Sequence, residues 1–271
     1  MGLSGRHVVI TGGSGGVGVA VAKAFLERGC HVTIQFNTNP GPAEPLAAQY
    51  PSHCTLLQAQ VTDEKQVAGL FTAAIERHGP VEVLVVSHGI WPAEDVGVKD
   101  MSLDRWRNTI AVNLDGTFLF VREFLRQLET AVKSNSPAIE APAIVLVGST
   151  AGKFGEAWHA DYSASKTAMM YGLISSLKNE IVKVHPRARI NTVSPGWIRT
   201  PMAERALQDP SLLFQALAST PLKKVSEPHD VAQAILFLAD ANTSGNITGV
   251  SLDLNGGMEG RMLNRLEDFQ N

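Results

Sequence analysis

Alternation of short apolar runs with longer helical patterns is the feature that most constrains the fold of this 271-residue chain. Most of the runs are continuously apolar and rich in β-branched residues, as in strands buried on both faces of a parallel sheet. They predict strands at residues 7–11, 31–36, 54–61, 81–87, 143–149, 189–195 and 249–254. Apolar residues at helical spacing predict helices at residues 18–29, 63–79, 103–133, 161–184 and 228–241. The chain is therefore expected to be an α/β protein built on a doubly wound parallel sheet.

The connections between these elements give no sign of a second domain. Residues 1–271 contain no internal repeat, low-complexity tract or linker, so we expect one domain. The turn-rich residues 37–45 and 134–142 are predicted loops. Residues 198–226 contain three prolines after a strand end, which is typical of a flap over a site and equally of an irregular connection. The polar tail 258–271 is expected either to fray or to cover a neighbouring subunit's site.

Composition and charge exclude several classes of partner. The net charge of −3 is spread over interspersed acidic and basic residues, so we expect no nucleic-acid partner. No apolar stretch is long enough to span a bilayer, and no targeting or lipidation signal is present, which predicts a soluble cytoplasmic protein. Cys30 and Cys54 fall in no metal-ligand spacing, so we expect no metal and reduced cysteines, although two cysteines can also pair.

The glycine-rich stretch "TGGSGGVG" (11–18) links the first predicted strand to the first predicted helix. Glycines let backbone N–H groups approach a phosphate, and the helix N-terminus adds a favourable positive partial charge. A tight turn alone would also need glycines, but the position within a strand–helix–strand unit favours dinucleotide binding. Gly12, Gly16 and Gly18 have the spacing G-x-x-x-G-x-G rather than the more usual G-x-G-x-x-G.

Tyr162 and Lys166 lie four positions apart in a predicted helix and so share one face of it. Alone, such a pair is common on ordinary helices. Ser149 ends a predicted strand thirteen residues earlier, and ligands bind at the carboxyl ends of strands in parallel α/β sheets. Asn113 lies inside a predicted helix, where asparagine is mildly unfavourable. Taken singly, each of these residues also has a structural explanation.

These features occur together with further motifs in a fixed order, namely "TGGSGGVG", "NLDGTF" (113–118), "GSTAG" (148–152), "YSASK" (162–166), "SPGWIRT" (194–200) and "ITGVSLDLNGG" (247–257). In these motifs the chain resembles the single-domain branch of the short-chain dehydrogenase/reductase family over residues 5–257. The resemblance implies a three-layer, Rossmann-type fold around a seven-stranded sheet. It also implies an enzyme that transfers a hydride between a nicotinamide cofactor and a ketone or secondary alcohol.

The resemblance implies catalytic roles for Asn113, Ser149, Tyr162 and Lys166. Tyr162 matches the acid/base that exchanges a proton with the carbonyl oxygen, and Ser149 matches the residue that orients that carbonyl. A free phenol has a pKa near ~10. A neighbouring cation lowers such a pKa by roughly 1–3 units, so we expect Lys166 to lower the pKa of Tyr162. Lys166 also matches the position that binds the nicotinamide ribose, and Asn113 the position that holds a water in a proton relay.

The resemblance also predicts the cofactor-binding residues, whose identity bears on the choice between NAD and NADP. Relatives that prefer NAD carry an acidic residue at the end of the second strand, where this chain has Phe36. The neighbouring Asn37 and Thr38 can donate hydrogen bonds to a 2′-phosphate, less strongly than arginine. We therefore predict NADP(H), with NAD(H) as the alternative. The predicted cofactor-binding residues are Gly12, Ser14, Gly16, Val17, Gly18, Phe36, Asn37, Thr38, Gln60, Val61, Ser87, Gly89, Tyr162, Lys166, Pro195, Gly196, Ile198 and Thr200.

Two positions depart from the family pattern. The sequence "VSHG" (86–89) replaces the usual Asn-Asn-Ala-Gly, so the asparagine side chains that brace the sheet are missing. We expect His88 to be a polar wall residue near the cofactor. Gln60 replaces an aspartate that meets the adenine amino group, and its amide can still form hydrogen bonds.

Bulky apolar residues, Met258 among them, fall in the segments that surround the active site in the family. The predicted substrate-binding residues are Trp91, Ser149, Trp158, Trp197 and Met202. Tryptophans in these loops would line an aromatic pocket for a bulky, partly apolar carbonyl compound, or would only pack the loops together. His159 is expected to face either the substrate or the solvent.

Two other functions stay open on the sequence alone. A non-catalytic dinucleotide-binding sensor or scaffold is supported only by "VSHG" and Gln60, because such proteins typically lose a catalytic residue. A sugar-nucleotide epimerase or dehydratase also uses a Tyr-x-x-x-Lys pair, but those relatives carry a longer C-terminal substrate domain. The family's habit further predicts a homo-oligomer, a tetramer or dimer built through the long helices and the last strand.

Overall fold

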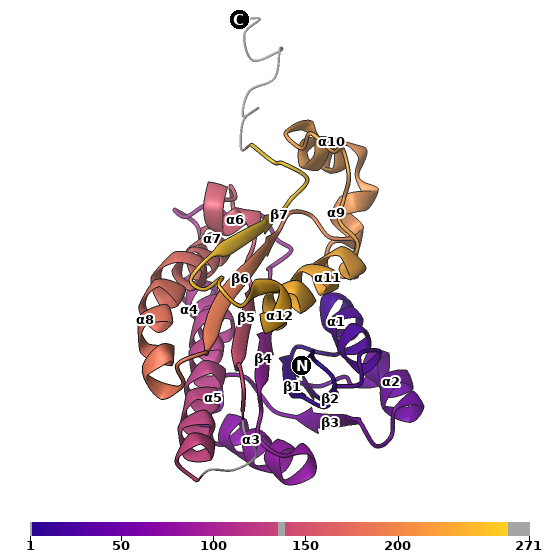
Figure 1. Ribbon diagram of the computed structural model, residues 1–271. Helices are drawn as coiled ribbons and strands as arrows, with labels where there is room; N and C mark the ends of the chain where they lie inside the picture. The colour runs from indigo at the N-terminus through magenta and orange to yellow at the C-terminus, as the bar shows by residue number, and fades with distance from the viewer. Residues whose placement is uncertain (1, 135–138, 260–271) are drawn as a thin grey trace, which may run out of the picture.

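The computed structural model describes residues 2–134 and 139–259 of the chain (Figure 1). Its centre is a sheet of seven parallel strands in the order β3-β2-β1-β4-β5-β6-β7. The strands are β1 (His7–Thr11), β2 (His31–Phe36), β3 (Cys54–Gln58), β4 (Val83–Val86), β5 (Ala143–Val147), β6 (Arg189–Pro195) and β7 (Ser251–Leu254). The strand order reverses between β1 and β4, so the carboxyl ends of these two strands form the crevice where such sheets bind ligands.

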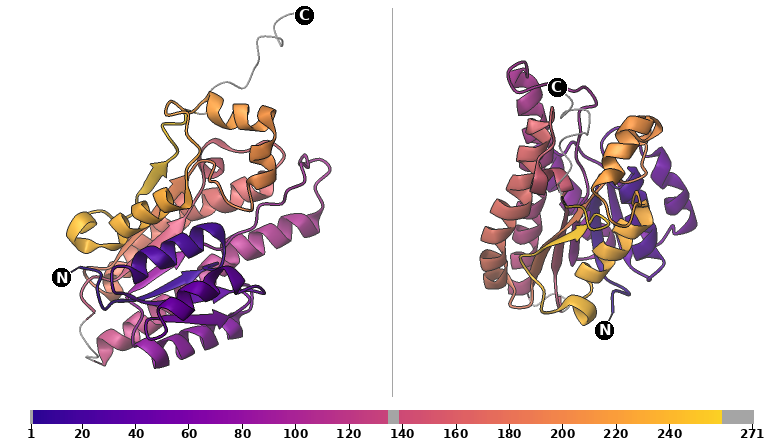
Figure 2. Two further views of the ribbon diagram at one scale, coloured as in Figure 1. Left: turned by 90° about the vertical axis from the view of Figure 1, so that its right-hand side faces the viewer. Right: turned by 90° about the horizontal axis from the view of Figure 1, so that it is seen from above.

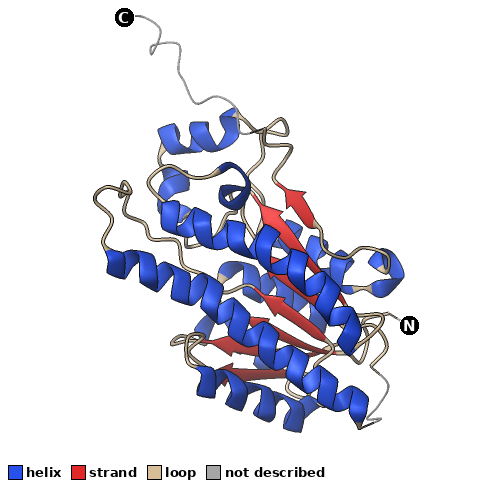
Figure 3. Ribbon diagram, turned by 90° about the vertical axis from the view of Figure 1, so that its left-hand side faces the viewer, coloured by secondary structure: helices blue, strands red, loops and turns tan. Residues whose placement is uncertain are grey.

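Helices cover both faces of the sheet, which is the doubly wound architecture expected from the sequence (Figures 2 and 3). The helices are α1 (Gly16–Leu26), α2 (Glu44–Gln49), α3 (Glu64–His78), α4 (Leu103–Ile110), α5 (Gly116–Lys133), α6 (Thr150–Phe154), α7 (Ala160–Thr167), α8 (Ile174–Val184), α9 (Glu204–Gln208), α10 (Pro210–Ala218), α11 (Pro228–Ala239) and α12 (Ala241–Ser244). A π-helical turn at Ala111–Asp115 joins α4 to α5, and another at Ala168–Leu173 joins α7 to α8. The long helices predicted at 103–133 and 161–184 are therefore each continuous.

The two faces of the sheet divide the strand residues between them. In β1, Val8 and Ile10 pack with α1 and α11, whereas Val9 packs with α3 and α5 on the opposite face. Phe25 of α1 and Phe120 of α5 are fully buried in these two opposite layers. Successive strand side chains point to alternate faces, and both faces are covered. The strand sequences are consequently apolar throughout.

Some boundaries differ from the predicted ones. The third strand ends at Gln58 rather than at residue 61, and the last begins only at Ser251 because Gly249, with a φ of 75°, leaves the extended conformation. Residues 198–226 contain two helices, α9 and α10, and a strand-like pairing of Ile198 with Ser226. Residues 135–138 of the predicted loop and 260–271 of the predicted tail lie outside the described residues.

Three further features concern the cysteines, membrane-spanning helices and metal ligands. Cys30 and Cys54 are both buried and free, so they do not pair with each other. Across residues 2–134 and 139–259, no helix combines the length and apolar character needed to cross a bilayer. In that same part of the chain, no group of three or more His, Cys, Asp and Glu residues is arranged to hold a metal ion.

Candidate active site

The glycine loop between β1 and α1 forms a cradle at the carboxyl edge of the sheet. Gly15 precedes α1, and no side chain caps the helix, so nothing from the loop competes for the N–H groups of its first turn. Gly12 has a φ of 59°, and a Cβ there would lie 2.7 Å from the Cα of His88. A Cβ on Gly18 would lie 2.3 Å from the carbonyl oxygen of Gly12. The loop therefore fits the pyrophosphate of a dinucleotide, with Ser14 and the first turn around it.

Gln35 of β2, which the sequence did not single out, holds this loop in place. Its Oε1 accepts a hydrogen bond from the N–H of Gly12 at 2.7 Å, and its Nε2 donates to the carbonyl oxygen of Ala59 at 2.6 Å. The side chain is buried. The sequence offered one signal of this role, a glutamine at the otherwise apolar end of "HVTIQF". A buried amide needs hydrogen-bond partners, so a glutamine in this place indicates a bond to a neighbouring group.

The end of β2 and the residues after β3 lie where the cofactor choice and the adenine contacts were predicted. Phe36 is half-buried, whereas Asn37 and Thr38 are exposed. Gln60 is also exposed, and its Nε2 donates to the hydroxyl of Thr62 at 3.2 Å. Val61, by contrast, is buried, and a Cβ on Gly116 of α5 would come within 3.1 Å of it. These positions offer neutral polar groups and no carboxylate.

His88 provides a brace in the place of the missing asparagine side chains. Its buried ring accepts a hydrogen bond from the Thr11 hydroxyl at Nδ1 (2.7 Å) and donates from Nε2 to the Val112 carbonyl oxygen (3.1 Å). The Thr11 Oγ1 also accepts from the N–H groups of Ser87 and His88. Burial, with the charge of Lys166 adding to it, lowers the pKa of His88 to about 3, so the ring is neutral and these roles are fixed. His88 itself braces β1, β4 and the π-helical turn before α5.

Asn113 is fully buried in that π-helical turn, a feature that recurs at functional sites. Its Oδ1 accepts a hydrogen bond from the N–H of Ile90 at 2.8 Å, and its Nδ2 donates to the Ile90 carbonyl oxygen at 3.0 Å. The same Nδ2 lies 3.0 Å from the hydroxyl of Ser165 in α7. A Cβ on Gly89 would lie 3.3 Å from its Oδ1. Asn113 thus ties the connection after β4 to the helix that carries Tyr162.

Lys166 and Tyr162 lie on one face of α7, as the spacing predicted. The Nζ of Lys166 donates to the carbonyl oxygen of Val147 at 2.8 Å and lies 5.7 Å from the centroid of the Tyr162 ring. A Cβ on Gly89 would lie 3.5 Å from the same Nζ. Burial lowers the pKa of Lys166 to about 8. A buried cation is therefore held between the ends of β4 and β5, beside the phenol.

The pKa of Tyr162 contradicts the expectation that Lys166 lowers it. Burial raises the pKa of Tyr162 to about 12, the charge of Glu156 adds to this rise, and a hydrogen bond with the Ser149 side chain opposes it. Ser149 also caps α6, where its Oγ accepts from the N–H of Ala151 at 3.1 Å. Removal of the phenolate from water therefore sets the direction of the shift, although the Lys166 ammonium lies beside the ring. The phenol is consequently held in its protonated form.

The chain after β6 returns to the glycine loop. Pro195 ends β6, and the N–H of Gly196 donates to the end of β7 at 3.1 Å. Ile198 pairs with the chain ahead of α11. A Cβ on Gly16 would lie 3.0 Å from the methyl group of Thr200. Thr200, which was predicted from the motif "SPGWIRT", therefore lies directly against the first turn of α1.

Two of the predicted substrate-binding tryptophans meet, and a third does not join them. The rings of Trp91 and Trp197 meet edge to face with centroids 6.2 Å apart. Trp91 also stacks on the buried His159, with centroids 4.6 Å apart, so His159 faces an aromatic ring rather than solvent. Trp158 is 58% exposed and packs on Gly97 instead. Spacing along the chain could not show which loops meet.

The two methionines near the site differ in exposure. Met202, between β6 and α9, is 56% exposed. It lies in residues 198–226, the predicted flap, which also contains α9 and α10. Met258 is half-buried, and its N–H donates to the Oδ1 of Asn255 at 3.2 Å. Neither position adds a polar group to the site.

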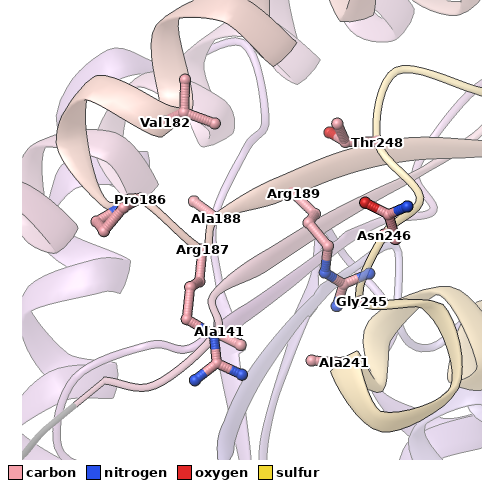
Figure 4. Close-up of a pocket in the computed structure, with 10 residues that line it drawn as sticks. All are labelled: Ala141, Val182, Pro186, Arg187, Ala188, Arg189, Ala241, Gly245, Asn246 and Thr248. Atoms are coloured by element: carbon pink, nitrogen blue, oxygen red, sulfur yellow. The ribbon is translucent and has the colours of Figure 1, made fainter.

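A cavity of about 210 Å³ lies elsewhere, at the amino end of β6 (Figure 4). Arg187 and Arg189 are among the residues that line it, and the Arg189 guanidinium donates to the last carbonyl oxygens of α11. Strand β6 has seven residues and rises about 3.3 Å per residue, so about 20 Å separates this cavity from Pro195. It is therefore distinct from the cradle and the Tyr162 site.

The fold and the site together define a class of protein. A parallel sheet with a glycine cradle at its switch point is typical of dinucleotide-binding α/β proteins. A protonated phenol beside a serine hydroxyl and a buried ammonium adds the groups needed to move a proton at a carbonyl or hydroxyl oxygen. The class is thus a dinucleotide-dependent enzyme.

Comparison with known proteins narrows this class. The family model described as "Enoyl-(Acyl carrier protein) reductase" matches residues 12–259. The chain is 31% identical over 258 residues to the 2,5-dichloro-2,5-cyclohexadiene-1,4-diol dehydrogenase LinX of Sphingobium indicum, covering 94% of this chain and 96% of that one. It is 29% identical over 256 residues to an NADP-dependent (R)-specific alcohol dehydrogenase of Lentilactobacillus kefiri, covering 94% and 97%.

A solved structure agrees with these relatives. The crystal structure titled "Short-chain dehydrogenase/reductase SDR:Glucose/ribitol dehydrogenase" from Brucella melitensis matches with a TM-score of 0.82 and 29% identity, covering 94% of this chain and 97% of that one. The chain belongs to the short-chain dehydrogenase/reductase family. It is an NAD(P)(H)-dependent oxidoreductase of that family.

Proposed function

We propose that this enzyme uses NADPH to reduce the carbonyl group of a bulky, partly apolar ketone to a secondary alcohol. The observation that carries the proposal is the position of Tyr162, whose ring centroid lies 5.7 Å from the Nζ of the buried Lys166 at the carboxyl edge of the sheet, with the Ser149 side chain close enough to act on its pKa. A bound nicotinamide dinucleotide supplies the hydride. The protein's own residues supply the proton and the orientation of the carbonyl.

The four catalytic candidates have separate roles in this proposal. Ser149 holds the carbonyl oxygen through its hydroxyl, and Tyr162 donates the proton that this oxygen takes up. A phenol with a pKa of about 12 stays protonated at neutral pH, which suits proton donation. Lys166 is charged below a pH of about 8 and stabilises the phenolate that remains. Asn113 orders the backbone next to Lys166, where a water of the proton relay would bind.

The proposed substrate follows from the aromatic wall. Trp91 and Trp197 come from two different strand ends and meet edge to face, which supports an apolar body on the substrate next to the reacting carbonyl. The names of relatives specify a chlorinated cyclic diol and an alcohol, which is compatible with a cyclic or aromatic ketone here. An NADPH-oxidation assay tests this, with cyclic and aromatic ketones expected to exceed small hydrophilic carbonyls. Preference for small polyols in the reverse assay would overturn the substrate proposal.

The preference for NADPH rests on the end of β2. No carboxylate there would repel a 2′-phosphate, and the exposed Asn37 and Thr38 offer it neutral donors. One relative is named as NADP-dependent. Titration with NADPH and NADH, followed by energy transfer from tryptophan to the nicotinamide, should give the tighter binding with NADPH. Tighter binding of NADH would reverse the preference, and binding of neither would favour the non-catalytic sensor.

We also propose that residues 1–271 act as one cytoplasmic domain within a homo-oligomer. Apolar side chains are exposed along the two long helical stretches, among them Phe118 and Val132 of α5 and Val182 of α8. Such faces are typical of protein–protein contacts. Light scattering should give the mass of a dimer or tetramer, and a monomer at micromolar concentration would contradict the proposal.

A further inference from the structure

Glu156 lies in the connection between α6 and α7, just before the helix that carries Tyr162. Its Oε1 accepts a hydrogen bond from the indole N–H of Trp91 at 3.1 Å. The same oxygen lies 3.8 Å from the Nδ1 of His159. Within the described residues, no group donates a hydrogen bond to the second oxygen, Oε2, and 27% of the side chain is exposed. One oxygen is engaged, and the other has no donor among the described residues.

The surroundings of Glu156 make this open oxygen a strong acceptor. Burial raises the pKa of Glu156, and the charges of Asp95 and Asp161 add to that rise, while His159 and the Trp91 hydrogen bond oppose it. His159 is buried, and its Nε2 lies 2.8 Å from the Pro92 carbonyl oxygen. The carboxylate is thus partly desolvated and incompletely paired, and an additional donor would stabilise it.

The carboxylate is also within electrostatic reach of the reacting phenol, because its charge contributes to the raised pKa of Tyr162. It accepts a hydrogen bond from Trp91, whose ring meets that of Trp197 in the proposed substrate-binding wall. A neutral acceptor would hold the Trp91 indole equally well. A carboxylate at this place costs desolvation that a purely structural role does not require.

We propose that Glu156 determines substrate specificity by accepting, at Oε2, a hydrogen bond from a hydroxyl or ammonium group carried next to the carbonyl that is reduced. The substrate class is then an α-hydroxy ketone or an amino ketone with an apolar body, rather than a plain ketone. This inference rests on the proposed carbonyl reduction. A substrate without the donor leaves the carboxylate facing an apolar group, which disfavours its binding in the transition state.

The test compares kcat/KM for ketones that differ in one substituent, namely α-methylcyclohexanone, α-hydroxycyclohexanone and protonated α-(dimethylaminomethyl)cyclohexanone, with NADPH as the reductant. The wild-type enzyme should prefer at least one donor-bearing ketone over the methyl ketone by about tenfold or more. The Glu156→Gln variant keeps an oxygen for Trp91 but removes the charge. It should lose that preference, because its kcat/KM for the donor-bearing ketones falls relative to its kcat/KM for the methyl ketone. The two donor ketones separate a hydroxyl from an ammonium as the favoured group.

Two controls keep the result unambiguous. Asp95→Asn removes a charge from the same neighbourhood, 3.9 Å from His159 but 69% exposed, and should leave the preference intact. Equal NADPH affinity and an unchanged thermal midpoint show that Glu156→Gln is folded. Equal rates for all ketones in the wild type, or an undiminished preference in Glu156→Gln, would overturn the role of Glu156 alone. Absence of turnover of every ketone by the NADPH-loaded enzyme would overturn the proposed function and this inference with it.

Discussion

The two edges of the sheet use the same type of residue for opposite purposes. At the carboxyl edge, His88 gives both ring nitrogens to hydrogen bonds with backbone and hydroxyl groups and thereby shapes the glycine cradle. At the amino edge, four histidines contact one another. This histidine cluster consists of His7, His31, His53 and His78. Loops at the carboxyl edge carry the site, whereas packed rings lie at the amino ends of β1 and β2.

The histidine cluster differs from His88 because a proton on one of its rings makes the neighbouring rings harder to protonate. The His31 ring stacks on His53 at 4.7 Å and lies 5.0 Å from His78, and His7 lies 5.3 Å from His78. Burial first, and the neighbouring imidazoles after it, lower the pKa of His7 and of His78 to about 4. Burial and the neighbouring His53 also lower the pKa of His31. One charge in this cluster therefore opposes the next. We therefore expect the carboxyl edge to govern activity, whereas the amino edge contributes to acid stability together with His88, whose lowered pKa acts in the same direction.

Replacement of Tyr162 by phenylalanine is expected to have the largest effect at the carboxyl edge. Loss of the proton donor should reduce kcat for ketone reduction by about 10²–10⁴-fold, because general acid catalysis contributes that much. Dinucleotide affinity and the free energy of unfolding should stay close to those of the wild type. Steady-state kinetics, dinucleotide titration and urea denaturation measure the three quantities. Retention of kcat in Tyr162→Phe would remove the residue from the reaction.

At the amino edge, acid should lower stability before it alters the site. A histidine with a lowered folded pKa binds its proton more readily in the unfolded chain, so stability is complete above pH 6.5 and is lost as the pH falls towards 4. For the buried His7 alone, this amounts to about 2 kcal/mol at pH 5. Urea denaturation at pH 7.5 and pH 5 checks the loss.

The variant His31→Phe isolates the cluster from other acid effects. The Nδ1 of His31 has no hydrogen-bond partner, so a phenyl ring keeps the stacking without losing a bond at that atom. The loss of stability between pH 7.5 and pH 5 should become smaller, and kcat at neutral pH should not change. Carboxyl groups with lowered pKa values, such as Asp161, act only below pH 4 and do not interfere. An identical pH dependence in His31→Phe would exclude the cluster as the cause.

His88 offers the matching test at the opposite edge. In His88→Leu the Thr11 hydroxyl and the Val112 carbonyl oxygen lose their partner, which costs about 1–3 kcal/mol. Part of that loss should appear as a roughly tenfold higher KM for the dinucleotide, because Gly12 lies against His88. His88→Asn, which keeps a donor and an acceptor, should restore some of the affinity. A lower thermal midpoint with an unchanged KM would show that the brace serves folding alone.

The same comparison shows what the sequence could and could not predict. Strands and the glycine loop were predictable, because apolar runs buried on two faces and a glycine loop before a helix each have a single physical explanation. The histidine cluster was not, since His7, His31 and His78 are far apart in sequence and meet only when the sheet forms. The raised pKa of Tyr162 depends on burial by tertiary packing, which spacing along one helix does not contain.

The smallest expected effect concerns Lys166 and separates binding from proton transfer. Because burial lowers its pKa to about 8, Lys166 loses its charge between pH 7 and pH 9, whereas Tyr162 and Cys54 titrate at about 12 and about 11. A neutral amine still donates a hydrogen bond to a ribose hydroxyl, but a weaker one. Dinucleotide affinity should therefore fall by about fivefold as the pH rises through 8, and this pH dependence should vanish in Lys166→Met. Tyr162 does not titrate in that window, so a fall of kcat with the same midpoint would show that Lys166 helps to stabilise the phenolate. A fall in dinucleotide affinity alone would restrict Lys166 to holding the cofactor.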